Sequence, residues 1–147
     1  MACYAFVNAK SYNGLGSYSA DKINDLNDNS YWRSEKTELI SDEEKYLELI
    51  VPKGIYVNRI EIKWNALYYP KQFYIWAKSN SLGKYMLFDG ADNFEPADLS
   101  NDLIWTFPAD SSTDQIGNNR YIKILCTKLN DSSIDSYAID EIRIYQE

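Results

Sequence analysis

Short segments in which apolar and polar residues alternate recur along the whole chain, and they constrain its fold more than any other feature. In IYVNRIEIKW (55–64), Ile60, Ile62 and Trp64 share one face and charged residues share the other. Other segments with strand signals, among them short apolar runs, lie at 3–9, 46–51, 72–79, 84–88, 103–107, 120–128 and 138–146. This alternation is typical of antiparallel strands with one buried face. With the turn residues between the segments, it predicts an all-β antiparallel sandwich or barrel.

Helical signals are confined to 19–26 and 95–103, and each is long enough for about one turn, too short for a stable free helix. The chain has 147 residues. Since domains usually contain roughly 100–200 residues, we expect one domain over 1–147. A chain of this length can bury a core that needs neither a metal ion nor a disulfide to fold.

Charge and composition exclude several classes of function. The formal net charge is -7, which argues against nucleic acid or an anionic membrane as the partner. No apolar run approaches the roughly 18 residues of a membrane span. The chain contains no histidine, which removes the usual Ser-His-Asp and Cys-His catalysts and histidine-based zinc sites. We therefore expect a protein that is not an enzyme, in which oxygen-ligated ions such as calcium remain feasible.

Cysteine usage indicates a buried thiol rather than a disulfide framework. Cys126 shares one face of its segment with Ile122 and Ile124, which favours a buried thiol. A bridge between Cys3 and Cys126 remains open, because sequence does not fix their distance. The residues interpreted mainly as core aromatics are Trp32, Trp64, Trp76 and Trp105.

In SADKINDLNDNSYWRS (19–34), a dense run of polar residues comes directly before Tyr31 and Trp32. Several Asp and Asn side chains close to a large aromatic residue could hold a hard cation. The alternative is a solvated loop in which Asp and Asn serve turns, the commoner use of these residues.

The order of segments carries a further signal. The polar loop ending in Tyr-Trp is followed by YLELIVPKGIYVNRIEIKW, then YYPKQFYIWAKS, RYIKILCTK and finally YAIDEIRIY. This order resembles the discoidin, or coagulation-factor type C, family and the related family 32 carbohydrate-binding modules. The resemblance covers nearly the whole chain from about residue 4. It implies a jelly-roll β-sandwich of the galactose-binding-like type.

The resemblance also implies a structural calcium ion between the polar loop and the last strand. In the matching positions stand Asp25, Ser30 and Glu141, through their side chains, and Lys22, Asn27 and Asp140, through backbone carbonyls. Carboxylate, hydroxyl and carbonyl oxygens are the ligands that calcium prefers. Leu26 departs from the family pattern, which usually has glycine there.

In the family, ligands meet loops at one end of the sandwich. Here the loop after Trp64 reads NALYYP, and Tyr68 and Tyr69 fall outside the strand alternation. Tyrosine stacks on sugars or anchors protein interfaces. The other expected ligand contacts are Arg33, Asn65 and Tyr137. The alternative is that a tyrosine of this loop folds back onto the rim of the sandwich.

The sequence therefore predicts a non-catalytic module that binds a glycan or a cell-surface ligand and belongs to a larger protein. The rival is a protein-interaction module in an intracellular or multi-subunit assembly. A glycosylation sequon, Asn130-Asp131-Ser132, favours an extracellular location. No signal peptide is visible, and no cysteine after Cys126 could complete the family's terminal disulfide, which favours the rival. Membrane docking is the least expected.

Overall fold

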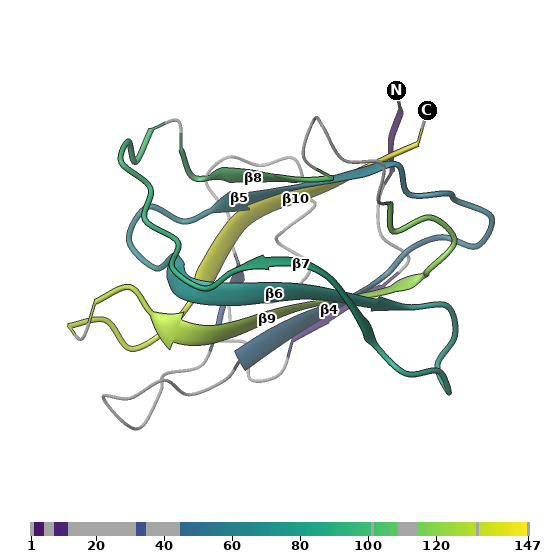
Figure 1. Cartoon of the computed structure of the whole chain (residues 1–147), viewed down its shortest axis with the longest axis horizontal. Helices are drawn as coiled ribbons and strands as arrows, with labels where there is room; N and C mark the ends of the chain where they lie inside the picture. Colours follow the sequence, from purple (N-terminus) through teal and green to yellow (C-terminus); the bar gives the residue numbers. More distant parts are fainter. Residues whose placement is uncertain are drawn as a thin grey trace.

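Two antiparallel sheets packed face to face form the molecule (Figure 1). The computed structural model describes residues 2–4, 8–11, 32–34, 45–100, 102–108, 115–131 and 133–146. Sheet A has the order β1 (Ala2–Tyr4), β10 (Ala138–Gln146), β5 (Arg59–Trp64) and β8 (Ile104–Phe107), with β3 (Trp32–Arg33) also pairing with β10. Sheet B has the order β2 (Asn8–Ser11), β4 (Lys45–Ile50), β9 (Tyr121–Leu129), β6 (Pro70–Lys78) and β7 (Met86–Ala91). The predicted all-β antiparallel sandwich is confirmed.

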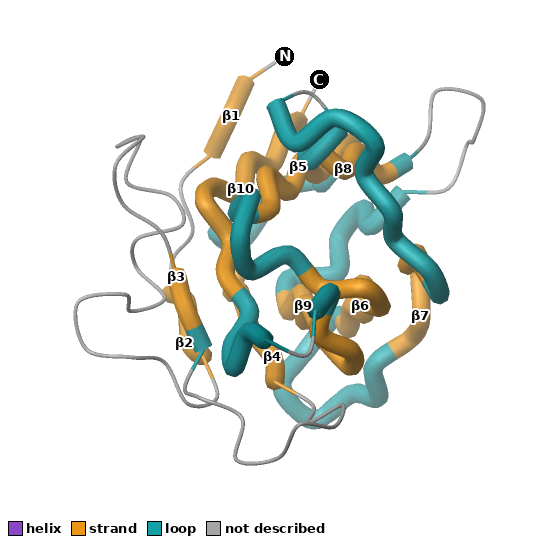
Figure 2. Tube along the Cα trace, turned by 90° about the vertical axis from the view of Figure 1, so that its left-hand side faces the viewer, coloured by secondary structure: helices purple, strands orange, loops and turns teal. Residues whose placement is uncertain are grey.

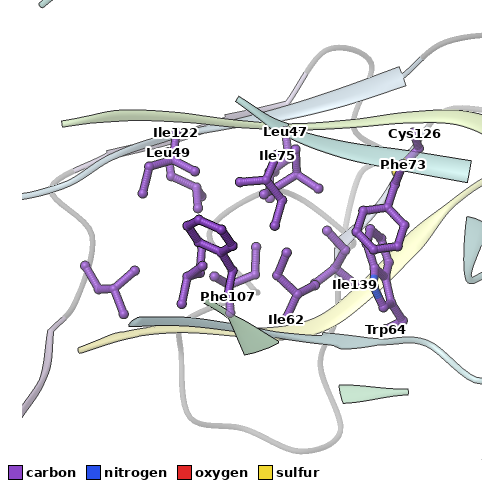
Figure 3. Close-up of a cluster of buried hydrophobic side chains, with 14 of the residues drawn as sticks. Leu47, Leu49, Ile62, Trp64, Phe73, Ile75, Phe107, Ile122, Cys126 and Ile139 are labelled. Carbon is purple, nitrogen blue, oxygen red and sulfur yellow. The ribbon is translucent and has the colours of Figure 1, made fainter. Parts of the chain in front are cut away.

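The inner faces of the two sheets make the core (Figure 3). Ile62 and Trp64 point from sheet A toward Phe73 and Ile75 of sheet B, and all four have no exposed surface. The ring centroids of Trp64 and Phe73 lie 4.7 Å apart. The alternation read from the sequence therefore reports burial between two sheets, as in other sandwiches.

The N-terminal strand prediction is wrong in one respect. The segment 3–9 was expected as one strand, but β1 pairs with β10 in sheet A and β2 pairs with β4 in sheet B. The apolar residues of 3–9 end where β2 begins, since β2 has the sequence NAKS. A short apolar run does not by itself show where a chain passes from one sheet to the other.

Cys126 is a free thiol with no exposed surface on the inner face of β9. Burial raises the pKa of this thiol well above its usual range. The expected buried thiol is confirmed, and a bridge to Cys3 is not formed.

The tryptophans do not all lie in the core. Trp32 and Trp64 have no exposed surface, and Trp105 packs against the core while half-buried. Trp76 departs from the prediction, because Ile75 and its alternate neighbours on β6 occupy the inner face. The indole of Trp76 therefore lies on the outer face of sheet B.

Within the described residues there is no helix, and thus none long or apolar enough to cross a membrane. The predicted helical turn at 95–103 is a turn in which the Asp102 backbone N–H donates to the Asp98 carbonyl at 2.8 Å. The segment 19–26 lies outside the described residues.

The connections β5–β6, β7–β8 and β9–β10 gather at one end of the sandwich, on the left of Figure 1. Figure 2 looks onto this end, with sheet A above and sheet B below. Residues far apart in sequence meet here: the Ala138 N–H donates to the Tyr68 carbonyl at 3.0 Å. The loop residues expected to contact a ligand lie at this end.

Candidate functional site

An arginine stacked on a tyrosine marks the loop end of the sandwich. The Arg33 guanidinium carbon lies 4.2 Å from the centre of the Tyr68 ring. Arg33 Nε donates to Ser136 Oγ at 2.8 Å, and its NH2 group lies 3.4 Å from Asp135 Oδ1. We call Arg33, Tyr68, Asp135 and Ser136 the Arg33–Tyr68 cluster. It joins β3, the β5–β6 loop and the β9–β10 loop.

The short strand β3 holds Arg33 in place. Its neighbour Trp32 is buried, and the pairs Ala138–Arg33 and Ile139–Trp32 fix β3 against β10. Because successive side chains on a strand point to opposite faces, burying Trp32 turns Arg33 away from the core.

Tyr137, one of the residues expected to contact a ligand, lies beneath the surface of the loop end. Its side chain has no exposed surface. Its backbone N–H donates to Ser34 Oγ at 2.9 Å, and its carbonyl accepts from the Ser34 N–H at 2.8 Å. Tyr137 anchors the β9–β10 loop from inside, directly beside Ser136 of the cluster.

Asn65 shapes the tyrosine loop. Its side-chain oxygen accepts from the N–H groups of Leu67 (3.0 Å) and Tyr68 (3.2 Å). Its amide nitrogen donates to Asp140 Oδ1 at 2.9 Å. An asparagine that bonds backbone groups two and three residues ahead fixes a tight turn. The structure thus brings Asn65 beside the cluster and engages its side chain in positioning Tyr68.

Tyr69 folds back onto the rim, as the alternative interpretation had it. Its ring meets Phe94 edge to face at 5.9 Å, and it packs against the core. Asn130 Nδ2 donates to the Tyr69 carbonyl at 2.7 Å and to the Leu67 carbonyl at 3.1 Å. A hollow of about 150 Å³ lies here, lined by Tyr69, Lys71, Phe94, Glu95, Pro96 and Asn130.

The expected calcium ligands are only partly within the described residues. Lys22, Asp25, Asn27 and Ser30 lie outside them. Asp140 and Glu141 begin β10, and Glu141 is 6% exposed. A carboxylate buried to this degree needs a cation or hydrogen-bond donors nearby, which fits a cation ligand. Among the described residues, no group of three or more His, Cys, Asp or Glu side chains is placed to hold a metal.

Asp140 carries the clearest electrostatic perturbation near the site. Burial raises the pKa of its carboxyl, and the hydrogen bond from Asn65 and the charge of Lys63 oppose this shift. Burial dominates because removing a carboxylate from water penalises the charged form. The side chain is therefore held where a negative charge is costly.

Sequence reasoning missed three residues of this end: Asp135, Ser136 and Asn130. Asp135 and Ser136 contact Arg33, and Asn130 ties down the carbonyls of the tyrosine loop. Asn130 was noticed only as part of a sequon. Their polar character was visible, but only the pairing of β3 with β10 brings Asp135 and Ser136 to Arg33.

The cluster offers a ring face, a guanidinium, a carboxylate and a hydroxyl within a few ångströms. Such a set binds a ligand that has apolar C–H faces and hydroxyl groups, because rings stack on the former and charged groups bond the latter. Asp135 is 42% exposed and Arg33 18% exposed in their side chains, so both reach the surface.

Solved structures with the same fold include carbohydrate-binding modules. The family 32 module of NanJ from C. perfringens, in complex with galactose, is 21% identical to this chain. The alignment covers 95% of this chain and 93% of the NanJ module, with a TM-score of 0.72. Chitosan-binding module 1 of a chitosanase/glucanase from Paenibacillus sp. IK-5 is 16% identical (95% and 94% covered, TM-score 0.72). The family 32 module of AlyQ, in complex with 4,5-unsaturated mannuronic acid, is 15% identical (100% and 100%, TM-score 0.69).

The chain has the galactose-binding-like fold of these modules. No protein-family model and no curated protein matches its sequence. The resemblance read from the order of segments is thus confirmed in the fold.

Proposed function

We propose that this protein is a non-catalytic glycan-binding module and that the Arg33–Tyr68 cluster is its binding site. The observation that carries the proposal is the stack of the Arg33 guanidinium on the Tyr68 ring at 4.2 Å, with Asp135 and Ser136 at its edge. The modules named above bind sugars on the same fold, which supports a sugar as the ligand.

The neighbourhood of the cluster supports contact with a ligand. Leu67, one residue before Tyr68, is 57% exposed, so the loop presents apolar surface next to charged groups. Asn65 and Asn130 fix the loop backbone, which lowers the entropy lost on binding. A rigid aromatic side chain beside hydrogen-bonding groups is the usual arrangement for selecting one sugar orientation.

The test is a glycan array followed by titration calorimetry on the best sugar. Tyr68→Ala and Arg33→Gln should each weaken binding at least about tenfold, since truncating an anchor at the centre of a site typically costs 1–2 kcal/mol or more. Both should leave the melting temperature nearly unchanged. Tyr69→Ala is the matched control and should lower stability instead, because Tyr69 packs on Phe94.

The rival function is a protein-interaction module within an assembly, and exposed Leu67 is the feature that favours it. An array without hits, together with a protein captured by the wild type and lost in Leu67→Ser, would replace glycan binding with this function. Under the glycan proposal the module works as part of a larger protein, as the Paenibacillus module is derived from a chitosanase/glucanase.

We also propose that calcium stabilises this module. Buried Glu141 supports it, with Asp25, Ser30 and the carbonyls of Lys22, Asn27 and Asp140 as the other expected ligands. An ion bound only by the folded state would add roughly 2.7 kcal/mol at a hundredfold excess over its dissociation constant. Chelation should lower the melting temperature, and Glu141→Gln should abolish the response. Equal melting with calcium and with chelator would reject the proposal.

A further inference from the structure

The outer face of sheet B is rich in aromatic rings. On β4, β6 and β9 the inner positions are fully buried, and the outer positions are half-buried. The outer aromatic residues are Tyr46, Tyr74, Trp76 and Tyr121, and Tyr85 precedes β7 beside them. An antiparallel sheet with one solvated face usually carries polar residues there. This face therefore departs from the usual pattern, and no element of the described chain packs over it as a third layer (Figures 1 and 2).

Two lysines stand among these rings. Lys78 Nζ lies 4.4 Å from the centre of the Tyr85 ring and 5.6 Å from that of Tyr121. Lys123 Nζ lies 4.9 Å from the Tyr46 ring and 5.3 Å from the Tyr85 ring. Both ammonium groups thus share Tyr85, and the register Lys78–Tyr121 brings their strands together. Cation–π contacts hold the two charges at defined positions on the face.

The two ammonium groups keep donors for a ligand. Lys78 Nζ donates to the Ser81 carbonyl at 3.3 Å, and neither lysine forms an ion pair with any described residue. Each ammonium has three N–H donors, so several stay available. The nearby carboxylate, Glu48, accepts a hydrogen bond from the Tyr85 hydroxyl. Burial and Glu48 raise the pKa of Tyr85, so this hydroxyl stays a donor at neutral pH.

We propose that the outer face of sheet B is a second binding surface, which takes a carboxylated glycan: pyranose rings lie on the tyrosines, and a uronate carboxylate bridges Lys78 and Lys123. Charge complementarity selects this occupant. The whole chain is acidic at -7, yet two cations and one carboxylate, Glu48, surround Tyr85, and that carboxylate accepts from the Tyr85 hydroxyl. A second carboxylate of this face, Asp92, is engaged by the Tyr74 hydroxyl at 2.6 Å. Aromatic rings select the sugar ring, and ammonium groups select the acid.

The surface is separate from the Arg33–Tyr68 cluster. Lys78 is the last residue of β6, and Pro70, which follows the tyrosine loop, is the first, so the two lie at opposite ends of the strand. The choice of a glycan rather than another anion rests on the proposed function, but the location does not. The two sites can therefore be tested apart.

The experiment uses trigalacturonate and its fully methyl-esterified form, which has the same rings without the charges. Titration calorimetry at low salt should show binding of the acid and at least about tenfold weaker binding of the ester. Lys78→Gln and Lys123→Gln should each weaken binding of the acid about fivefold to tenfold without lowering the melting temperature. Equal affinity of the wild type for trigalacturonate and for its methyl ester would overturn the proposal.

A gain of affinity gives a sharper check. Glu48→Gln removes the carboxylate that accepts from the Tyr85 hydroxyl but keeps an oxygen to accept from it. It should strengthen binding of trigalacturonate several-fold and leave the ester unchanged, since only a like charge is removed. Unchanged or weaker binding of the acid would contradict a carboxylate seated at the lysines.

A variant of the other site separates the two proposals. Arg33→Gln with Tyr68→Ala should leave trigalacturonate binding unchanged while removing the sugar found on the array. If the double variant loses both ligands, the acid binds at the loops and the sheet B surface is refuted. If it loses only the array sugar, both sites stand. A protein partner lost in Lys123→Gln, with no trigalacturonate binding, would assign this face to protein contact instead.

Discussion

The outer faces of the two sheets use their side chains differently. On sheet A, Arg59 NH2 lies 3.3 Å from Glu61 Oε1, and the Tyr145 hydroxyl donates to Glu61 at 3.3 Å while its ring faces Arg59 at 4.5 Å. Arg59 and Glu61 there form an ion pair. On sheet B, the cations Lys78 and Lys123 rest on tyrosine rings instead. The charges of Arg59 and Glu61 are therefore engaged with each other, whereas neither Lys78 nor Lys123 forms an ion pair with a described residue.

The strand sequences show the origin of this difference. In β5, RIEIKW alternates strictly, so every outward residue is charged. In β6, FYIWA is apolar or aromatic at every position, so both faces of the strand carry apolar surface. A strand that is apolar on both faces has either a covering layer or a binding role. The predictions below test how far the two faces of sheet B, and the two outer faces, differ.

The largest effect is expected on the inner face of β6. Phe73→Ala should lower the free energy of unfolding by about 3–5 kcal/mol, because Phe73 has no exposed surface and its ring contacts Trp64 at 4.7 Å. Chemical denaturation measures this. Trp76→Ala on the outer face should cost about 1–2 kcal/mol, since the indole is only half-buried. Equal losses would mean that the outer face is covered like a core.

A smaller effect compares two indole N–H groups. Trp105 Nε1 donates to Asp89 Oδ2 at 2.7 Å, whereas the buried Trp76 Nε1 has no hydrogen-bond partner among the described residues. Trp105→Phe should therefore cost about 1.5–3 kcal/mol, the range for a hydrogen bond to a charged group. Trp76→Phe should change stability by less than about 1 kcal/mol, because it removes an N–H that bonds nothing there. Denaturant midpoints of both variants check this, and a large loss in Trp76→Phe would contradict it.

Much of the fold could be predicted from sequence, and the places where prediction failed are instructive. Alternation located β10 to the residue and the end of β5, although β5 begins at Arg59 rather than at residue 55 as predicted. Alternation could not predict which side chains of β6 face the core, because FYIWA has no polar residues to identify the outer face, and Trp76 faces outward. It also could not divide 3–9 between two sheets, since this segment does not alternate between apolar and polar residues. Alternation identifies a face only when the other face is polar.

The candidate site was predictable by position but not by role. The loop after Trp64 was recognised, and Tyr68 meets Arg33 there. Tyr69 packs on Phe94 and Tyr137 is buried, because which of several tyrosines faces outward depends on the turn that Asn65 fixes. Such outcomes depend on contacts between residues more than sixty positions apart, such as Asn130 to Tyr69. A single sequence without homologues does not reveal these pairings.

The ion pair on sheet A should contribute little, in keeping with its exposure. Glu61→Gln should lower the free energy of unfolding by about 0.5–1 kcal/mol at low salt, because it weakens the pair with Arg59 and the bond from Tyr145. Half a molar salt should remove most of the difference. Lys123→Gln on sheet B should change stability less, and its effect should appear in ligand binding. A stability loss in Lys123→Gln larger than in Glu61→Gln would reverse the comparison.

The smallest effect concerns Asp140, at the start of β10 in sheet A. Burial raises the pKa of its carboxyl, so folding favours the protonated form and this group's contribution to stability falls as pH rises through the raised pKa. Asp140→Asn keeps an oxygen to accept from Asn65 Nδ2 and removes the charge. The variant should be more stable than wild type at pH 7 by about a few tenths of a kcal/mol after solvent screening. Near pH 3, where wild-type Asp140 is protonated, the difference should vanish. Melting curves from pH 3 to 8 measure it, with Glu61→Gln as a control at another carboxylate of sheet A. A variant less stable at pH 7 would show that attraction to Lys63, or to a bound cation, outweighs the cost of burying this carboxylate.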